Sequence, residues 1–170
     1  LIAKSNYRWS QNSDIVVRMP CGGGVGAGPF HSQTNEVWFS KVPGLKIVYP
    51  AFPSDAKGLL HSSIDDPNPV LFFEHKGLYR SVKANVDNGL YSTDIGKGSI
   101  IKEGNSLSII TYGMGVHWAI ESITALPQDY HNKIEIIDLK SLVPWDKELV
   151  LNSIKKTNRA MILHEATHTS

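Results

Sequence analysis

Six short apolar runs, rich in Ile and Val, alternate with segments of helical periodicity, and this alternation constrains the fold more than any other feature. The runs span residues 14–19, 45–49, 69–74, 107–112, 134–138 and 160–164. Continuous apolar runs of this length are typical of strands that are buried on both faces of a parallel sheet. Strands that alternate with helices predict an α/β fold, and crossovers of this length predict parallel strands.

Apolar side chains recur at helical spacing in most of the gaps between the runs. Three predicted helical faces consist of Ala56, Leu59, Leu60 and Ile64, of Val116, Ala119, Ile120 and Ile123, and of Leu149, Val150 and Ile154. Ser54 and Asp146 are predicted to cap the first and the third of these helices, since Ser and Asp are favoured at that position. A fourth, less regular helix is predicted over residues 32–40.

Between Glu74 and Leu107 the helical pattern fails, and the chain is polar and marked by Gly and Asn. We interpret this stretch as a linker between two α/β units, with an edge strand near residues 98–101. Each unit then has three strands, which is small for a doubly wound domain. We therefore expect the first unit to be incomplete at its N-terminus and the second at its C-terminus.

Charge and cysteine content exclude several classes of protein. Seventeen Lys and Arg against sixteen Asp and Glu give a net charge of +1, so a nucleic-acid partner is not expected. No apolar run is long enough to span a membrane, and the N-terminal residues have no signal-peptide pattern. Cys21 is the single cysteine, which rules out an internal disulfide and favours a reducing, intracellular compartment.

The densest motif is the glycine-rich segment CGGGVGAGPFHSQTNE, residues 21–36. Gly22, Gly24 and Ala27 match the dinucleotide fingerprint G-x-G-x-x-A. Prolines flank the loop, however, and the next strand lacks the acidic residue that would hold a ribose, so nucleotide binding is disfavoured. Such a loop lets a ligand or another backbone approach closely.

His31 stands at the end of this loop. A single His is more often structural than catalytic, but this one follows a predicted strand and precedes a predicted helix. Open α/β sheets bind ligands at the carboxyl ends of their strands. An imidazole there can move protons on a bound substrate near neutral pH.

Two other motif matches lack the context that their chemistry needs. His164, Glu165 and His168 fit the zinc-protease pattern H-E-x-x-H, which requires both His on one face of a helix. Here His164 ends a strand-like run, so a protease is disfavoured. Ser54 and Lys57 fit S-x-x-K of penicillin-recognising enzymes, but no S-D-N or K-T-G accompanies them.

Two adjacent acidic residues precede Pro67. Asp65 and Asp66 fit a plain turn that ends a helix, and less strongly a cation site completed by carbonyl oxygens of the turn. The residues alone thus predict an intracellular α/β protein with a glycine-rich site that carries His31, but they do not predict a reaction.

Five ordered motifs, however, resemble a known family. They are IVVRMPCGGGVGAGPFHSQTNEVWF, PGLKIVYPAFPSDAKGLLHSSIDDPNPVLFFEHKGLYR, ITYGMGVHWA, EIIDLKSLVPWD and IKKTNRAMILHEA. The chain resembles the β subunit of the thiamine-diphosphate-dependent decarboxylating component of 2-oxo acid dehydrogenase complexes. NYRWS, FFEHKGLYR and GMGVHWA are most similar to branched-chain (2-oxoisovalerate) dehydrogenases, and pyruvate dehydrogenase is the close alternative.

The resemblance implies a division of the chain into parts of two α/β domains. Residues 1–85 would be the later part of a transketolase-like pyrimidine-binding domain with a mostly parallel sheet. Residues 86–103 would be a linker, and residues 104–170 the first part of a transketolase C-terminal-like domain. The chain is then an internal fragment of a longer subunit.

The resemblance also implies a reaction. His31 matches the catalytic His of the family, and would assist proton transfers while a 2-oxo acid is decarboxylated and its acyl unit passes to a lipoyl group. Thiamine diphosphate and magnesium would be bound mainly by residues upstream of Leu1 and by an α partner, so the chain is not expected to be active alone. The implied partners are an α subunit or fused α part, a second β subunit and a lipoylated acyltransferase core.

A structural potassium ion is a further implication. The matching positions are Ser63, Asp66 and Asn68, which would contribute mainly carbonyl oxygens. The positions that would complete the site are Ser13, Ile15 and Val16, and the match around Ser13 is poor.

Two questions stay open. The resemblance implies a bacterial cytoplasmic enzyme in preference to a mitochondrial-matrix one. A non-catalytic interaction module, acting through surfaces such as the VPWDKE turn, is the alternative to an enzyme.

Overall fold

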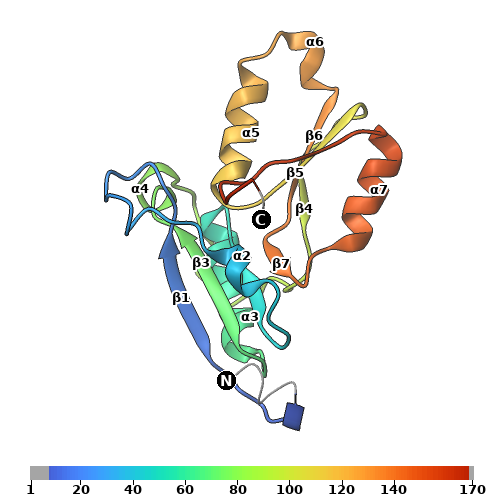
Figure 1. Cartoon of the computed structure of the whole chain (residues 1–170). Helices are drawn as coiled ribbons and strands as arrows, with labels where there is room; N and C mark the ends of the chain where they lie inside the picture. The colour runs from blue at the N-terminus through green and yellow to red at the C-terminus, as the bar shows by residue number, and fades with distance from the viewer. Residues whose placement is uncertain (1–7, 169–170) are drawn as a thin grey trace.

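The strands of the chain form two four-stranded sheets in a computed structural model that describes residues 8–168 (Figure 1). The first sheet has the order β1-β3-β2-β7, with β1 (Val16–Cys21), β2 (Lys46–Val48), β3 (Val70–His75) and β7 (Ser141–Val143). The second has the order β4-β6-β5-β8, with β4 (Ser99–Lys102), β5 (Leu107–Thr111), β6 (Ile134–Asp138) and β8 (Ala160–Ile162). Strands β1, β2 and β3 run parallel, as do β5, β6 and β8, so the predicted α/β fold is confirmed.

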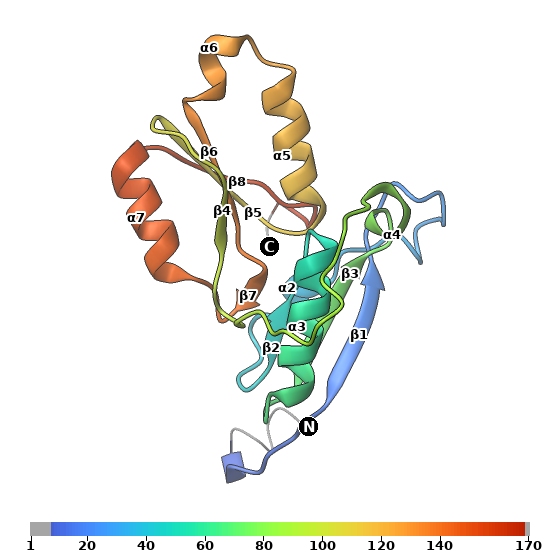
Figure 2. The same ribbon diagram turned by 180° about the vertical axis from the view of Figure 1, so that it is seen from behind.

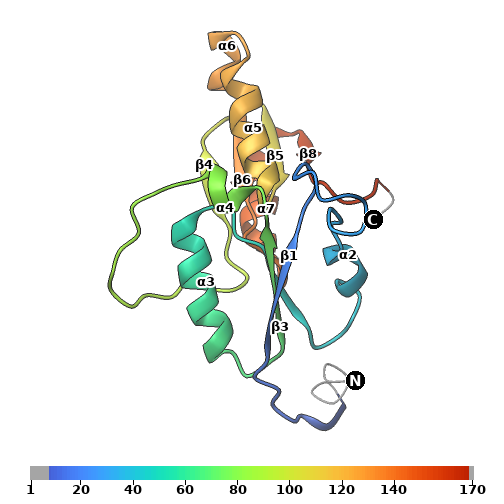
Figure 3. The same cartoon turned by 90° about the vertical axis from the view of Figure 1, so that its left-hand side faces the viewer.

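Helices cover both faces of each sheet. They are α2 (Glu36–Phe39), α3 (Pro53–Asp65), α4 (Leu78–Ser81), α5 (Met114–Thr124), α6 (Gln128–His131) and α7 (Lys147–Thr157). Helices α2 and α3 lie on opposite sides of the first sheet (Figure 3). Helices α5 and α7 lie on opposite sides of the second sheet (Figure 1). Within the described residues, no helix has the length and apolar character needed to cross a membrane.

Alternate residues of the central strands build the two cores of the first sheet. Ile47 and Phe73 face α2 and pack with Phe39, while Val48 and Phe72 face α3. The predicted apolar face of α3 supplies Leu59, which is fully buried against this second layer. Side chains that alternate between two covered faces explain why these strands consist of continuous apolar runs.

The second sheet repeats this arrangement. Ile109 and Ile136 pack against α5, and Ile110 and Ile137 pack against α7. The helical spacing predicted from the sequence is confirmed here, since α5 buries Val116, Ala119 and Ile123, and α7 buries Val150.

Two strands predicted to be buried are edges. Strand β1 is only partly covered, with Val17 44% exposed, and β8 is exposed along its length. Each pairs with a single neighbour, so one side and much of its surface stay open. The expected edge strand near residues 98–101 is confirmed as β4, which runs antiparallel to β6.

Strand β7 was not predicted, and it links the two halves of the chain. It follows β6 in sequence but pairs antiparallel with β2 of the first sheet. Lys140, just before it, accepts a hydrogen bond from the Tyr49 amide through its carbonyl (2.8 Å) and forms an ion pair with Asp55 of α3 (2.8 Å). The first sheet therefore contains a strand from the C-terminal part of the chain.

Two predicted helix starts are wrong. Helix α3 begins after Phe52, and Ser54 lies inside its first turn without capping it. Pro53 takes the first helical position, where its fixed φ and missing N–H cost nothing. The helix predicted over residues 32–40 is confined to Glu36–Phe39, because Ser and Thr residues at its expected start are weak helix formers. Asp146 does cap α7, accepting a hydrogen bond from the Leu149 amide at 3.1 Å.

Candidate functional site

The carboxyl ends of β1 and β3 lie together because the two strands are parallel neighbours. Cys21, the last residue of β1, is in register with His75, the last residue of β3. The glycine-rich loop that follows β1 therefore lies beside the turn that leads into α4 (Figure 2). This is the position where open α/β sheets bind ligands.

The glycine-rich loop is closed at its base by backbone hydrogen bonds. The Gly22 amide donates to the Gln33 carbonyl (3.0 Å), and the Lys76 amide donates to the Cys21 carbonyl (2.9 Å). The loop then needs several left-handed backbone positions, with φ of +71° at Gly24 and +71° at Gly28. Glycine adopts these conformations without the penalty that a Cβ would impose.

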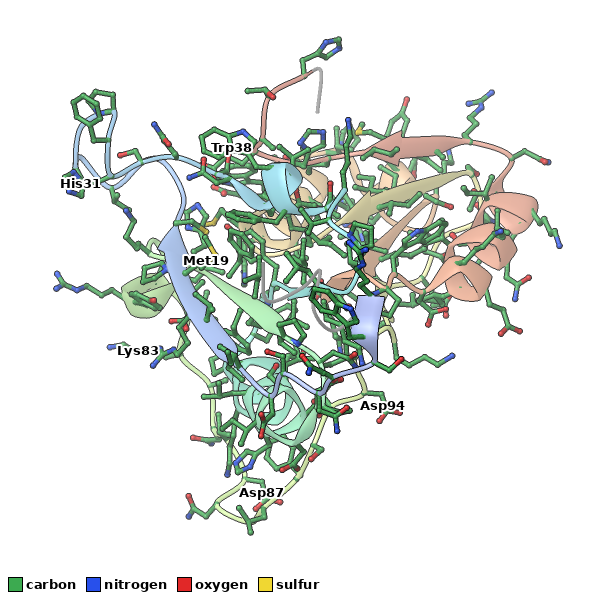
Figure 4. All side chains as sticks on the ribbon, turned by 60° about the horizontal axis from the view of Figure 1, so that its bottom comes forward. Met19, His31, Trp38, Lys83, Asp87 and Asp94 are labelled. Carbon is green, nitrogen blue, oxygen red and sulfur yellow. The ribbon has the colours of Figure 1, made fainter. Side chains whose placement is uncertain are left out.

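His31 lies on the outer part of this loop and is exposed to solvent (Figure 4). The Lys76 ammonium contacts the His31 carbonyl and fixes the backbone there. Among the described residues, no hydrogen bond involves the His31 ring. Both ring nitrogens are therefore free to meet a bound molecule, as a proton-transfer group requires.

A hollow of about 320 Å³ opens beside His31. It is lined by Met19, Pro20, Cys21, Phe30, His31, Gln33, Asn35, Phe73 and Lys76. None of these lining residues is acidic. The hollow therefore has no carboxylate that could activate the aminopyrimidine ring of thiamine diphosphate, the cofactor that the family resemblance implies. No group of three or more His, Cys, Asp or Glu in the described part of the chain could hold a metal ion. The hollow thus offers His31 for proton transfer but no carboxylate for that cofactor.

Cys21 lies at the floor of the loop as an inert thiol. Its Sγ is 3.0 Å from the Tyr49 hydroxyl, and its side chain is buried. Burial raises the pKa of this thiol to about 11. Since the thiolate is the reactive form, Cys21 is not a nucleophile at neutral pH.

The second sheet contributes two contacts to the same region. Tyr112, just after β5, donates a hydrogen bond to Glu36 of α2 (2.8 Å). Glu165, beyond β8, accepts from the Gly23 amide (2.9 Å) and from His75 Nε2 (3.1 Å). Neither Glu165 nor His75 was predicted as a site residue, because no spacing rule connects segments so far apart in the chain.

The H-E-x-x-H match does not form a metal site. His164, Glu165 and His168 lie in an irregular segment after β8, so the two His do not share a helical turn. Glu165 is instead occupied by the contacts to the glycine-rich loop and to His75. The sequence disfavours a zinc protease at this motif, and the geometry agrees with that expectation.

The residues predicted for a cation site lie at the opposite end of β3 from His31. Helix α3 ends at Asp65, as the turn interpretation expects, and Asp66 follows in an extended conformation. Burial favours the neutral Asp66 carboxyl, but hydrogen bonds from Lys46 and Asn68 outweigh it and lower its pKa. The Ser63 hydroxyl donates to the Leu59 carbonyl at 2.7 Å, which leaves the Ser63 carbonyl as its available ligand.

Helix geometry leaves the Ser63 carbonyl without its usual partner. The residue four positions after Ser63 is Pro67, which has no N–H, so helix α3 cannot supply the usual partner for the Ser63 carbonyl. The Asp66 carboxylate, in contrast, already contacts the Lys46 ammonium. The predicted donors are thus a carbonyl that lacks an i+4 donor and a carboxylate that already contacts a lysine.

A larger hollow of about 530 Å³ lies away from His31, against α3 and α4. Its polar wall is the group of Arg18, Glu74 and Tyr79, in which Arg18 and Tyr79 both donate to the Glu74 carboxylate. Burial favours the neutral Glu74 carboxyl, but the hydrogen bonds from Arg18 and Tyr79 outweigh it and lower the pKa of Glu74. Burial and the hydrogen bond to Glu74 together raise the pKa of Tyr79 to about 12. The group is satisfied internally and has no proton to exchange at neutral pH.

Comparison with known proteins assigns both halves of the chain. Residues 2–82 match the family model "Transketolase, pyrimidine binding domain", and residues 96–170 match "Transketolase, C-terminal domain". A solved structure titled "Split gene transketolase, inactive beta4 tetramer" superposes with a TM-score of 0.70 over 89% of this chain and 47% of that one. At 21% identity it shows the fold alone.

Relatives with similar sequences are subunits of two kinds of dehydrogenase. The chain is 43% identical to the 2-oxoisovalerate dehydrogenase subunit beta of Bacillus subtilis, over 96% of this chain and 49% of the relative. It is 42% identical to the mitochondrial 2-oxoisovalerate dehydrogenase subunit beta of Chaetomium thermophilum, over 89% of this chain and 32% of the relative. It is also 42% identical to the pyruvate dehydrogenase E1 component subunit beta of Mycoplasma pneumoniae, over 91% and 47%.

The chain thus spans about half the length, or less, of the relatives it matches. Its two matched segments follow one another in the same order as the two sheets of the structure. The expectation drawn from the five sequence motifs is confirmed at the level of the family. The chain belongs to the transketolase-like family that includes the β subunits of 2-oxo acid dehydrogenases.

Proposed function

We propose that the chain is part of the β subunit of a thiamine-diphosphate-dependent 2-oxo acid dehydrogenase of the branched-chain (2-oxoisovalerate) type. The complete enzyme would decarboxylate a 2-oxo acid and transfer the acyl unit to a lipoyl group. The relatives include both branched-chain and pyruvate enzymes, so the preference for a branched substrate rests on the NYRWS, FFEHKGLYR and GMGVHWA motifs.

The observation that carries this proposal is the placement of His31. It is held by its backbone at the carboxyl end of a parallel sheet, with its ring free and facing solvent beside a hollow. Thiamine diphosphate, when bound, supplies an electron sink for the decarboxylation. The role that we assign to His31 is to hold or move a proton at the substrate carbonyl and in the transfer to the lipoyl group.

The division of the chain follows from this assignment. We propose residues 1–85 as the later part of the pyrimidine-binding domain, 86–103 as a linker, and 104–170 as the first part of the C-terminal domain. The hollow near His31 has no acidic lining residue. As the family resemblance implies, we propose that other parts of the complete subunit and the α partner activate the cofactor and hold its magnesium.

The partners that we propose are an α subunit or fused α part, a second β subunit and a lipoylated acyltransferase core. Large apolar side chains near the site support a covered surface, since Phe30 is 86% and Trp38 is 68% exposed. Exposed aromatic residues of this kind are enriched where proteins associate. We also retain the potassium site at Ser63, Asp66 and Asn68 as a proposal.

The test is His31→Ala in the full-length subunit assembled with its α partner. Loss of an acid–base group lowers the rate by on the order of a hundredfold or more, so the overall reaction with the lipoylated partner should fall by that amount. His168→Ala is the matched control, because His168 is exposed and lies outside the site. Its activity should equal that of the wild type.

Unchanged overall activity in His31→Ala would remove this residue from the mechanism and favour a non-catalytic interaction module. A loss in His168→Ala of the same size would instead show that the motif at residues 164–168 has a role that the proposal does not include.

A further inference from the structure

Three contacts hold the base of the glycine-rich loop, one within the loop and two to Lys76 just after β3. The Gly22 amide donates to Gln33, the Lys76 amide donates to the carbonyl of Cys21, and the Lys76 ammonium contacts the carbonyl of His31. These contacts hold the two ends of the loop, but its first turn needs a further partner for the Gly23 amide.

That partner comes from the second sheet. Glu165 Oε1 accepts from the Gly23 amide at 2.9 Å, and Glu165 Oε2 accepts from His75 Nε2 at 3.1 Å. One carboxylate thus joins the loop to the end of β3. Hydrogen bonds to a charged acceptor are stronger than those between neutral groups.

The orientation of His75 is set by its other nitrogen. Its ring is buried, and Nδ1 accepts a hydrogen bond from the Gly77 amide at 3.1 Å. An Nδ1 that accepts carries no hydrogen, so Nε2 bears the ring proton and points it at Glu165. His75 therefore acts as a fixed hydrogen-bond donor to Glu165.

Two glycines leave the space that this arrangement needs. A Cβ on Gly22 would lie 2.3 Å from the His75 ring, and a Cβ on Gly23 would lie 2.9 Å from Glu165 Oε1. The later loop glycines at positions 24, 26 and 28 have nothing within 4 Å of such a Cβ. Gly22 and Gly23 thus allow close contact, and Gly22, with a φ of +94°, also serves backbone conformation, as the later glycines do.

We propose that Gly23, His75 and Glu165 form a loop clamp, in which His75 and Glu165 are positioning residues that fix the place of His31 by attaching the loop to the second sheet. The clamp rests on the proposed function, because the residue that it positions, His31, has its role only under that proposal. Small displacements of a reacting group lower rates strongly, so loosening the clamp lowers activity without removing any group that touches the substrate.

Variants of the full-length subunit, assembled with its α partner, separate the two ends of the His75 ring. In His75→Asn the amide oxygen replaces Nδ1 and keeps the Gly77 contact, but the donor to Glu165 is lost. In His75→Gln the amide nitrogen replaces Nε2 and keeps that donor. We expect kcat to fall by on the order of tenfold or more in His75→Asn and Glu165→Ala, and to recover largely in His75→Gln. Glu121→Ala, on the exposed face of α5, is the control and should match the wild type.

A second comparison tells positioning from general damage. In a His31→Ala background, Glu165→Ala should change kcat little further, because its effect passes through His31. Amide exchange in residues 22–33 should become faster by on the order of tenfold in Glu165→Ala, with the cores of both sheets unchanged.

The clamp is overturned if Glu165→Ala leaves exchange in residues 22–33 unchanged, or if it lowers kcat equally in both backgrounds. Failure of the proposed function has a different signature, since His31→Ala alone would then keep full activity. The exchange measurement still decides the clamp in that case.

Discussion

At the scale of single residues, Asp138 is in an environment that opposes its ordinary charge. Its side chain is fully buried at the end of β6, with Oδ1 accepting from the Lys140 amide at 3.0 Å. Oδ2 has no hydrogen-bond partner within the described residues. Burial, assisted by the nearby charge of Asp55 and opposed by Lys140, raises the pKa of Asp138 to about 7.

This raised pKa predicts a loss of stability as the pH rises. The folded protein keeps the proton on Asp138 up to about pH 7, whereas an unfolded chain releases it near 3.8. The folded state therefore binds more protons between these values, and the free energy of unfolding falls as the pH increases through that range. Thermal unfolding of the full-length subunit against pH should show the fall in the wild type and a smaller one in Asp138→Asn. Identical pH profiles would contradict the prediction.

The contacts around His31 show how far single residues can be predicted. The order of a strand, a glycine-rich loop and a polar segment in the sequence is enough to name His31 as a candidate site residue. Glu165 does not, because it lies 142 residues from Gly23 and meets it only when both sheets have formed. The H-E-x-x-H pattern instead groups Glu165 with His164 and His168, which do not share a helical turn.

At the scale of secondary-structure elements, the two predicted helix caps differ in outcome, and this difference can be measured. Asp146 accepts a hydrogen bond from Leu149, whereas Ser54 makes no capping bond. Loss of an N-cap bond costs about 0.5–2 kcal/mol, so Asp146→Ala should lower the free energy of unfolding by at least that amount, since Asp146 Oδ2 also accepts from the Gly98 amide at 3.3 Å. Ser54→Ala should change it by less than about 0.5 kcal/mol, as surface substitutions do. Denaturant unfolding checks both, and equal effects would show that the cap is not formed.

The turn between α3 and β3 carries the proposed potassium site. Potassium should raise the melting temperature of the full-length subunit above that in sodium or choline at equal ionic strength, because a ligand of the folded state stabilises it. Asp66→Ala should abolish this response. Lys46→Met is the matched control, since it removes the ammonium partner of Asp66 and keeps the carboxylate. An equal melting temperature in all three salts would contradict the site.

Elements with a continuous apolar run or a helical apolar pattern were predictable, even where the strand itself is short, as in β2 and β8. The strands other than β4 and β7 lie in continuous apolar runs, and helices α3, α5 and α7 are long enough to show a helical period. Strand β7 lies outside any continuous apolar run, and α4 and α6 have four residues each, which is too few for a helical period to appear. Strand β7 exists because β2 offers it an edge, which is a property of the folded molecule.

At the scale of the whole molecule, the two sheets meet near the carboxyl ends of their parallel strands. Tyr112 and Glu165 extend from the second sheet to Glu36, Gly23 and His75 of the first. Together with β7, these contacts join the two matched domains around the base of the loop that carries His31. The edge position of β1 and the exposed aromatic residues fit the proposal that partner subunits cover this region.

The most direct test of this view is a substrate assay of the full-length subunit with its α partner. Thiamine diphosphate, magnesium and a lipoylated acyltransferase core would be supplied, and acyl transfer would be measured with 3-methyl-2-oxobutanoate and with pyruvate. We predict turnover that depends on all of these components and is faster with the branched acid. Faster turnover of pyruvate would correct the substrate type alone, whereas no turnover of either 2-oxo acid by the assembled, folded enzyme would contradict the proposed function.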